Sequence, residues 1–80
     1  MANDPQPQQE NDSTGWTPLV SSNLAAYNYT PATEILQIRF RSGRTYHYSP
    51  VPRDIVEGLG SATSPGAYFS ANIRDVFHYR

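Results

Sequence analysis

The sequence predicts an α+β domain, in which a three-stranded antiparallel β-meander carries two short C-terminal helices packed on one face. Two observations support this fold class. Over residues 34–48, apolar and polar side chains alternate with the two-residue period of a strand, and Gly43 interrupts the run near its centre. After Pro52, apolar side chains recur instead at helical spacing.

The first strand of the meander is expected over residues 23–30. A turn follows, because Pro31 at its second position favours type I geometry. Simple alternation along this strand would place Leu24 and Ala26 on one face. The other face would carry Ala25, Tyr27 and Tyr29.

The second and third strands, residues 34–41 and 44–49, are predicted to form a hairpin around Gly43, because glycine takes the positive φ of a tight turn. We expect the apolar side of the second strand to face the core, while Arg39 and Arg41 meet solvent. The inward side chains are Leu36, Ile38 and Phe40. The third strand would then be an edge that is open to pairing with a second copy.

The first helix is predicted to begin at Pro52, with Asp54 and Glu57 towards the positive end of its dipole. Gly58 and Gly60 keep this helix short. Its apolar stripe consists of Ile55, Val56 and Leu59.

The second helix is predicted to begin at Ser64 and Pro65, a capping residue followed by a first-turn proline. Its apolar stripe would consist of Phe69, Ile73, Val76 and Phe77. In an alternative arrangement, residues 76–79 leave the helix and extend along the sheet.

Residues 1–15 are predicted to be a disordered acidic tail, and residues 16–80 the folded domain. Proline and polar residues dominate the tail, which has no large apolar side chain after Met1. No apolar run approaches the ~20 residues that span a bilayer, and no secretion signal is present. We therefore expect a cytoplasmic protein, and the absence of cysteine excludes disulfides.

The chain has six arginines and no lysine. Beyond residue 15 the sequence contains all six arginines and only four acidic side chains. Guanidinium groups suit bidentate contacts with phosphate and stacking on aromatic rings. The codon usage of a GC-rich genome would equally explain the absence of lysine.

Catalytic and metal chemistry has little support in the sequence, so we expect no enzyme activity, no metal and no cofactor. His47 and His78 are the only imidazoles, and no cysteine accompanies them. His47 is best explained as a half-exposed strand residue. Gly66 lacks the neighbouring lysine of a phosphate loop.

The remaining functional signal is the group of arginines and tyrosines in the hairpin. The candidates for nucleic-acid binding are Arg39, Arg41, Arg44, Tyr46 and Tyr48. Guanidinium groups beside exposed rings hold phosphates and stack unpaired bases, as in readers of single-stranded RNA. In the structural alternative, the tyrosines are core residues under the helices and the arginines keep the hairpin soluble.

Several segments resemble the KTSC domain, a module named for its occurrence at the C-terminus of some lysyl-tRNA synthetases and also found as a free-standing bacterial or phage protein. They are VSSNLAA (20–26), FRSG (40–43), YHYSPVP (46–52), GAYF (66–69), NIRD (72–75) and YR (79–80). The resemblance covers about residues 18–80. Phe77-His78 replaces the Tyr-Pro pair of many members, so the terminal turn departs from the family pattern.

The resemblance implies an accessory contact with tRNA or another RNA, because the module accompanies a tRNA-handling enzyme. A free-standing copy would alternatively bind a protein, for example as a phage-encoded regulator of a host enzyme. Aromatic residues and arginine dominate protein interfaces. The candidates for this second role are Tyr68, Phe69 and Arg74.

Overall fold

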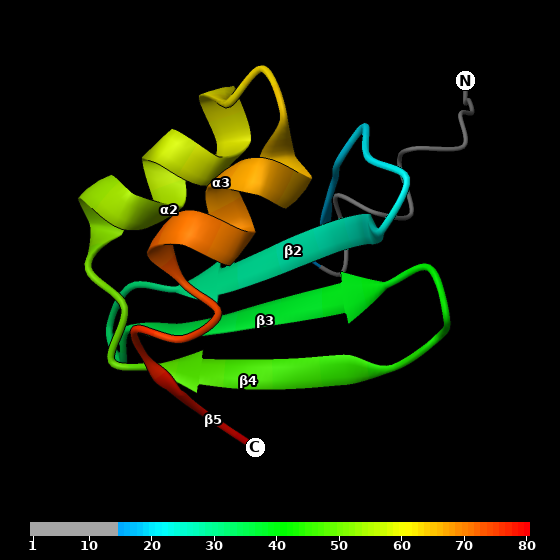
Figure 1. Cartoon of the computed structure of the whole chain (residues 1–80). Coiled ribbons are helices and arrows are strands. Elements are labelled where there is room, and N and C mark those ends of the chain that lie inside the picture. The colour runs from blue at the N-terminus through cyan, green and yellow to red at the C-terminus, as the bar shows by residue number, and fades with distance from the viewer. Residues whose placement is uncertain (1–14) are drawn as a thin grey trace, which may run out of the picture.

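The computed structural model describes residues 15–80, which form a sheet covered on one face by two helices (Figure 1). The elements are β1 (Thr17–Pro18), β2 (Leu24–Thr30), β3 (Ile35–Phe40), β4 (Thr45–Ser49), α2 (Arg53–Ser61), α3 (Pro65–Asn72) and β5 (His78–Tyr79). Apart from Gly15, the predicted tail over residues 1–15 lies outside the described residues. Within residues 15–80, neither helix has the length and apolar composition needed to cross a bilayer.

The strands pair antiparallel in the order β1-β2-β3-β4-β5, which is also their order in the chain. The predicted meander is confirmed as β2, β3 and β4. The prediction of three strands is wrong, because β1 and β5 extend the sheet at its two edges. Figure 1 shows β5 beside β4. Each has two residues, too few for alternation to be visible in a sequence. Since β5 pairs along β4, that strand is not the open edge that the sequence predicts.

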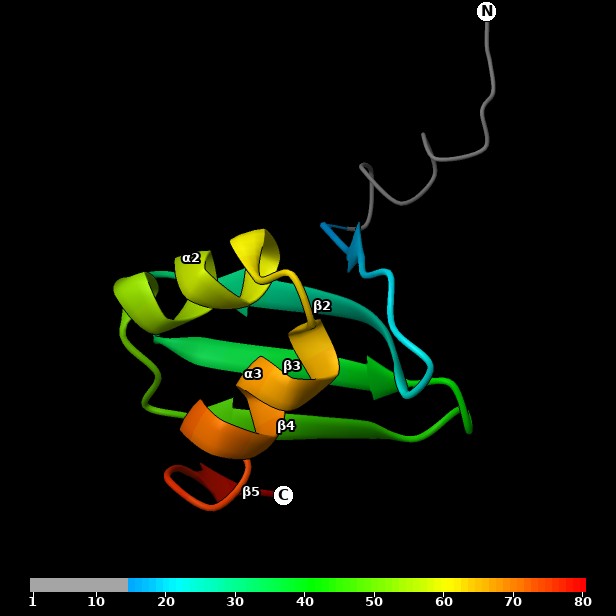
Figure 2. The same cartoon turned by 45° about the horizontal axis from the view of Figure 1, so that its top comes forward.

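The core lies between the helices and one face of the sheet. The turned view in Figure 2 shows both helices over this face. On β3, Leu36 and Ile38 are fully buried on this face, and Phe40 is half-buried beside them. Arg39 and Arg41 are exposed. The predicted division of this strand into an inward apolar side and an outward cationic side is therefore confirmed.

The prediction for the faces of β2 is wrong, because a β-bulge lies between Leu24 and Ala26. A bulge inserts one residue and reverses the alternation that follows it. The register pairs Leu24 with Phe40 and Tyr27 with Ile38. Directly opposed residues share a face, so Leu24 and Tyr27 both point towards the helices, while Ala26 points away from them.

Helix α3 begins where the sequence predicts and ends earlier. The Ser64 side chain accepts a hydrogen bond from the Ala67 amide at 3.4 Å, and Pro65 is the first helical residue. The helix ends at Asn72, and Val76 is 62% exposed. The predicted apolar stripe is therefore incomplete, and the alternative of an extended C-terminal segment is found as β5.

Two tyrosines pack on glycines inside α2. A Cβ atom at Gly58 would overlap the hydroxyl of Tyr68, from α3, and lie 2.6 Å from its Cζ. A Cβ atom at Gly60 would lie 2.9 Å from the hydroxyl of Tyr27, from β2. The Tyr68 hydroxyl also donates to the Ile55 carbonyl at 2.9 Å. The glycines thus permit close packing, and the helix ends at Ser61, one residue beyond Gly60.

Gly58→Ala is expected to lower the free energy of unfolding by about 1–3 kcal/mol, the usual effect of overpacking. The added methyl group displaces the Tyr68 ring, and this loss exceeds the roughly 1 kcal/mol by which alanine favours a helix over glycine. Chemical denaturation measures the change. Glu57→Ala, an exposed position of the same helix, is the control and should change stability by less than about 0.5 kcal/mol. A stabilised Gly58→Ala protein would show that Tyr68 does not pack on Gly58.

Candidate functional site

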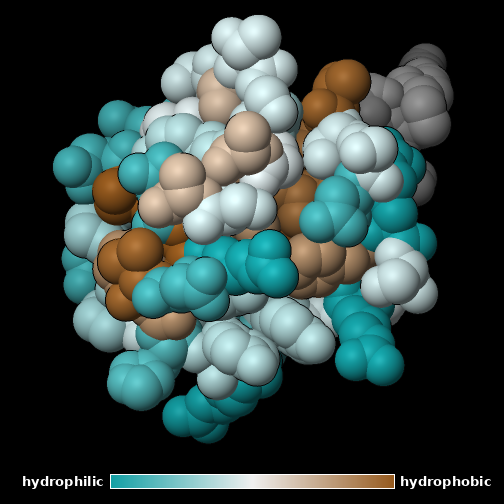
Figure 3. Space-filling view, viewed as in Figure 1, coloured by the Kyte–Doolittle hydropathy of each residue, from teal (hydrophilic) through white to brown (hydrophobic). Residues whose placement is uncertain are grey.

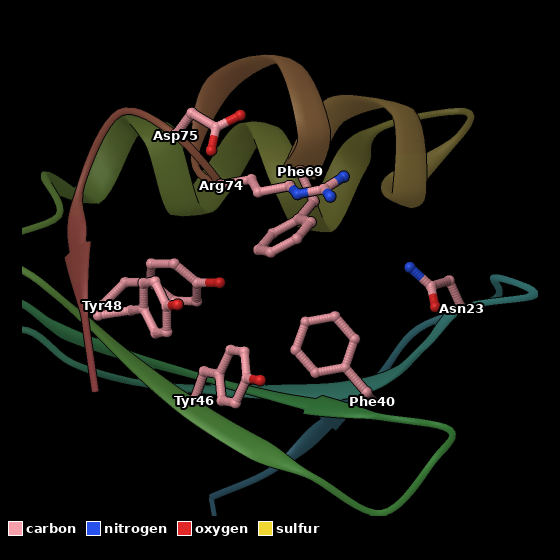
Figure 4. Close-up of a pocket in the computed structure, with 8 residues that line it drawn as sticks. Asn23, Phe40, Tyr46, Tyr48, Phe69, Arg74 and Asp75 are labelled. Atoms are coloured by element: carbon pink, nitrogen blue, oxygen red, sulfur yellow. The ribbon is translucent and has the colours of Figure 1, made fainter.

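A pocket of about 430 Å³ opens between the C-terminal end of α3 and the strands beneath it (Figure 4). It is lined by Asn23, Phe40, Tyr46, Tyr48, Phe69, Arg74, Asp75 and Tyr79. Sites for small ligands have volumes of about 300–1,000 Å³. The pocket is therefore large enough for a small molecule or for one residue of a polymer.

The register of the central hairpin directs the tyrosines of β4 into this pocket. Tyr46 lies opposite Ile38, and Tyr48 lies opposite Leu36. Since opposed residues share a face, both tyrosines point to the side covered by the helices. Tyr48 also lies opposite Tyr79, so β5 adds a third tyrosine to the same side.

The rings of the pocket contact one another. Phe40 meets Tyr46 and Phe69 at centroid distances of 5.5 and 5.6 Å. Tyr46 and Tyr79 stack at 5.0 Å with an angle of 23° between their planes. Tyr48 meets Phe69 and Tyr79 at 5.6 Å in each case. These contacts hold the rings in place around the open space.

Tyr48 is the most buried tyrosine of the pocket, with 2% of its surface exposed. Its hydroxyl points into the pocket (Figure 4) and has no hydrogen-bond partner among residues 15–80. Burial raises the pKa of Tyr48 to about 12, and the neighbouring Tyr79 and Tyr46 add to the rise. Because buried polar groups are normally hydrogen-bonded, this hydroxyl is a free contact for a ligand that enters the pocket.

Three polar side chains stand at the rim of the pocket. Arg74 and Asp75 follow the end of α3, and Asn23 precedes β2. In Figure 4 the Arg74 side chain extends over the pocket beside Phe69, and Asn23 lies at the opposite end. The rim therefore offers guanidinium donors, a carboxylate acceptor and an amide that can do both.

A smaller hollow of about 150 Å³ adjoins the pocket on the side of the hairpin turn. Its lining residues are Phe40, Ser42, Arg44 and Tyr46, and it shares the two aromatic ones with the pocket. Gly43 makes the turn with a φ of +99°, and its amide donates to the Phe40 carbonyl at 2.9 Å. Arg44 is thereby placed at one end of the aromatic surface.

The arginines of β3 lie apart from this pocket. Arg39 is opposite Thr45, on the face of the sheet without helices, and its guanidinium lies 4.1 Å from the centre of the Trp16 ring. Arg41 follows the end of the strand, and its Nε donates to the Ser21 carbonyl at 2.6 Å. Both guanidinium groups are thus held by neighbours that the sequence did not indicate.

The five candidates for nucleic-acid binding therefore do not form one surface. Tyr46 and Tyr48 line the pocket and Arg44 lines the adjoining hollow, whereas Arg39 lies behind the sheet and Arg41 at its end. The expectation of arginines beside tyrosines on a single face is wrong for Arg39. Successive residues of a strand point to opposite faces, so Arg39 points away from the helices, whereas its neighbour Ile38 and the opposed Tyr46 point towards them. Tyr48 is a core residue, as in the structural alternative.

Of the three candidates for protein binding, only Arg74 is exposed. Phe69 is 3% exposed, and Tyr68 is half-buried with its hydroxyl on Ile55. Phe69 and Arg74 line the same pocket as Tyr46. The two sites that the sequence suggests separately are thus partly one site.

Sequence reasoning missed Asn23, Asp75 and Tyr79 as site residues. Tyr79 reaches the pocket on a two-residue strand, and Asn23 and Asp75 lie in loops, so none of them belongs to a periodic pattern. A usable signal was nevertheless present, because every lining residue falls within one of the six segments that resemble the KTSC domain. Within residues 15–80, no three histidine, aspartate or glutamate side chains gather as a metal site.

Comparisons with known proteins agree with this resemblance. Residues 20–77 match the family model of the KTSC domain. The lysine–tRNA ligase of Nostoc sp. is 41% identical over 58 residues, which are 72% of this chain and 10% of the ligase. A protein of Stutzerimonas stutzeri is 39% identical over 62 residues, 78% of this chain and 86% of that protein. The chain thus spans about a tenth of the ligase and most of the second protein.

A crystal structure of a KTSC domain protein from Yersinia pestis has a similar fold. Its TM-score is 0.79 at 34% sequence identity, over 81% of this chain and 92% of that chain. The α+β arrangement of an antiparallel sheet and two helices is therefore shared with a solved structure.

Tyr48 predicts a loss of stability at high pH. Its pKa is about 12 in the folded protein and about 10 in an unfolded chain. The unfolded state therefore loses its proton first, and the stability contributed by neutral Tyr48 is complete below about pH 10 and declines as the pH rises towards 12. Chemical denaturation should show a smaller decline over this range for Tyr48→Phe than for the unchanged protein. Equal declines in the two proteins would mean that Tyr48 ionises as readily in the folded state as in the unfolded state.

Proposed function

Because this chain belongs to the KTSC domain family, of which a relative forms part of a lysine–tRNA ligase, we propose that it binds RNA. It acts without catalysis, as a module that holds an unpaired base in the aromatic pocket. Its place of action is the cytoplasm, where tRNA and other RNAs are found.

The observation that carries this proposal is the combination, in one pocket, of ring faces and of polar side chains that have no hydrogen-bond partner among residues 15–80. Single-stranded RNA is recognised by stacking of splayed bases on aromatic rings and by hydrogen bonds to their edges. Tyr79 is 58% exposed and stacks on Tyr46, so it offers ring surface to an incoming base. The Tyr48 hydroxyl and the rim residues Asn23 and Arg74 offer the hydrogen bonds.

Two arginines flank the pocket and supply the electrostatic part of the contact. Arg44 lies at the hairpin end of the aromatic surface, and Arg74 lies over the opposite side. Both are exposed. Guanidinium groups at the ends of a stacking surface can hold the phosphates on either side of a bound base.

The surface favours this function over protein docking. The exposed large apolar residues within residues 15–80 are Val20, Val76 and Tyr79. Figure 3 shows the apolar surface on this side as separate patches between polar side chains. Docking sites for proteins more often present one contiguous apolar patch, and Phe69 is too buried to contribute to one.

Tyr79→Ala is expected to weaken binding of a fluorescently labelled single-stranded RNA of about eight nucleotides, a length within the usual site size. The loss should be at least about five-fold, because stacking of a base on an aromatic ring contributes about 1–3 kcal/mol. Fluorescence anisotropy on the full chain measures the affinity. Tyr79→Phe keeps the ring and should bind within about two-fold of the unchanged protein.

Arg74→Ala should also weaken RNA binding and reduce its salt dependence, by a slope of about 0.7 for one lost phosphate contact. Arg53→Ala is the matched control, because Arg53 is also an exposed arginine, lies on α2 and does not line the pocket. Equal effects of the two variants would reject the pocket as the site. If the protein binds neither single strands nor tRNA, the RNA function is wrong, and the protein-binding alternative takes its place.

A further inference from the structure

Another hollow, of about 270 Å³, lies at the edge of the sheet formed by β4 and β5. It is lined by His47, Ser49, His78, Tyr79 and Arg80. None of these side chains is acidic, and each can donate a hydrogen bond. The hollow therefore differs in character from the aromatic pocket, although Tyr79 lines both.

Two cross-strand pairs bring the polar side chains together on the face of the sheet without helices. Ser49 lies opposite His78. His47 lies opposite Arg80, because the two residues exchange both backbone hydrogen bonds at 3.0 Å. Opposed residues in such pairs have Cβ atoms about 5 Å apart. Although His47 and His78 are far apart in the sequence, they are thus diagonal neighbours on adjacent strands.

The donor set suits an anion. Arg80 contributes a planar guanidinium, and a histidine gains positive charge between about pH 5 and 8. Ser49 adds a hydroxyl. Arginine and protonated histidine bind phosphate through charge-assisted hydrogen bonds, whereas Arg80 would repel a metal cation.

We propose that this hollow binds a phosphate group of the RNA strand whose unpaired base occupies the aromatic pocket. The inference rests on the proposed function. Tyr79 connects the two sites, because its strand is the edge that separates them. A single strand that crosses this edge beside Tyr79 places a base on the helix-covered side and the adjoining phosphate against His47, His78 and Arg80.

The charged groups around this hollow are of both signs. Arg80 lies opposite His47, and Arg39 on β3 lies on the same face of the sheet as the histidines. Asp75 shares a neighbouring hollow with His78, and the residue opposite His47 on β3 is the neutral Gln37. Where Arg80 is the last residue, its carboxylate also lies here, with its oxygen engaged by the His47 amide. Protonation of the two histidines adds to the charge of Arg80 and should strengthen anion binding.

The first test uses sulfate, whose charge is constant near neutral pH, as a probe for the anion site in the full chain. Added sulfate should shift the NMR signals of both imidazole rings, with an affinity at least about five-fold higher near pH 6 than near pH 8. The Arg80→Gln protein should lose most of this response. Arg53→Gln, which removes a distant exposed arginine, should retain it. If added sulfate shifts neither imidazole signal at either pH, the proposed anion site is wrong.

The second test measures RNA affinity by anisotropy for the unchanged protein and for His47→Gln/His78→Gln, whose altered side chains are both exposed. The unchanged protein should bind RNA at least about five-fold more tightly near pH 6 than near pH 8, and the double variant should lose this difference. RNA binding that is tight but equally pH-dependent in both proteins would overturn the inference and leave the proposed function standing. A sulfate response without any RNA binding would uphold the anion site. It would reject both the RNA function and the proposal that the anion is a phosphate group of RNA.

Discussion

The pairing of β3 with β4 determines which side of the sheet each functional side chain occupies. Leu36 and Ile38 must be buried under the helices, and their partners in the register are Tyr48 and Tyr46. A shift of one residue would turn the tyrosines to the opposite face and replace them with polar neighbours. The hydrophobic requirement of β3 therefore also places two rings of the pocket.

Two tyrosine hydroxyls, one from β2 and one from α3, bond to backbone carbonyls in or just before α2. The Tyr29 hydroxyl donates to the Val51 carbonyl at 2.6 Å, ahead of α2, and Tyr68 donates to Ile55 within it. Each of these rings packs against the apolar core, while its hydroxyl donates to a carbonyl oxygen. Tyr48 differs, because its hydroxyl has no such partner among residues 15–80 and faces the pocket. The same residue type thus serves the scaffold in one place and is left available in another.

The charge of the domain is divided between the two faces of the sheet. Arg44 and Arg74 border the pocket, while Arg39 stacks on Trp16 behind the sheet. The composition of the chain does not distinguish these three arginines, but only Arg44 and Arg74 adjoin the aromatic residues of the pocket. The edge strand β5 lies where the two faces meet, which is why the exposed ring of Tyr79 borders both the aromatic pocket and the 270 Å³ hollow.

Local chemistry was sufficient to predict the hairpin, the glycine turn, the capped start of α3 and the inward side of β3, because each depends on a few adjacent residues. The bulge in β2, the two-residue strands and the exposure of Val76 depend instead on pairing and packing partners that are distant in the chain. The site divides in the same way: arginine and tyrosine were recognisable as residue types suited to binding. The tertiary structure decided which of them share a face and brought Asn23, Asp75 and Tyr79 to the same pocket. The physical reason is that strand register and the path of the C-terminal segment bring together residues that no sequence period connects.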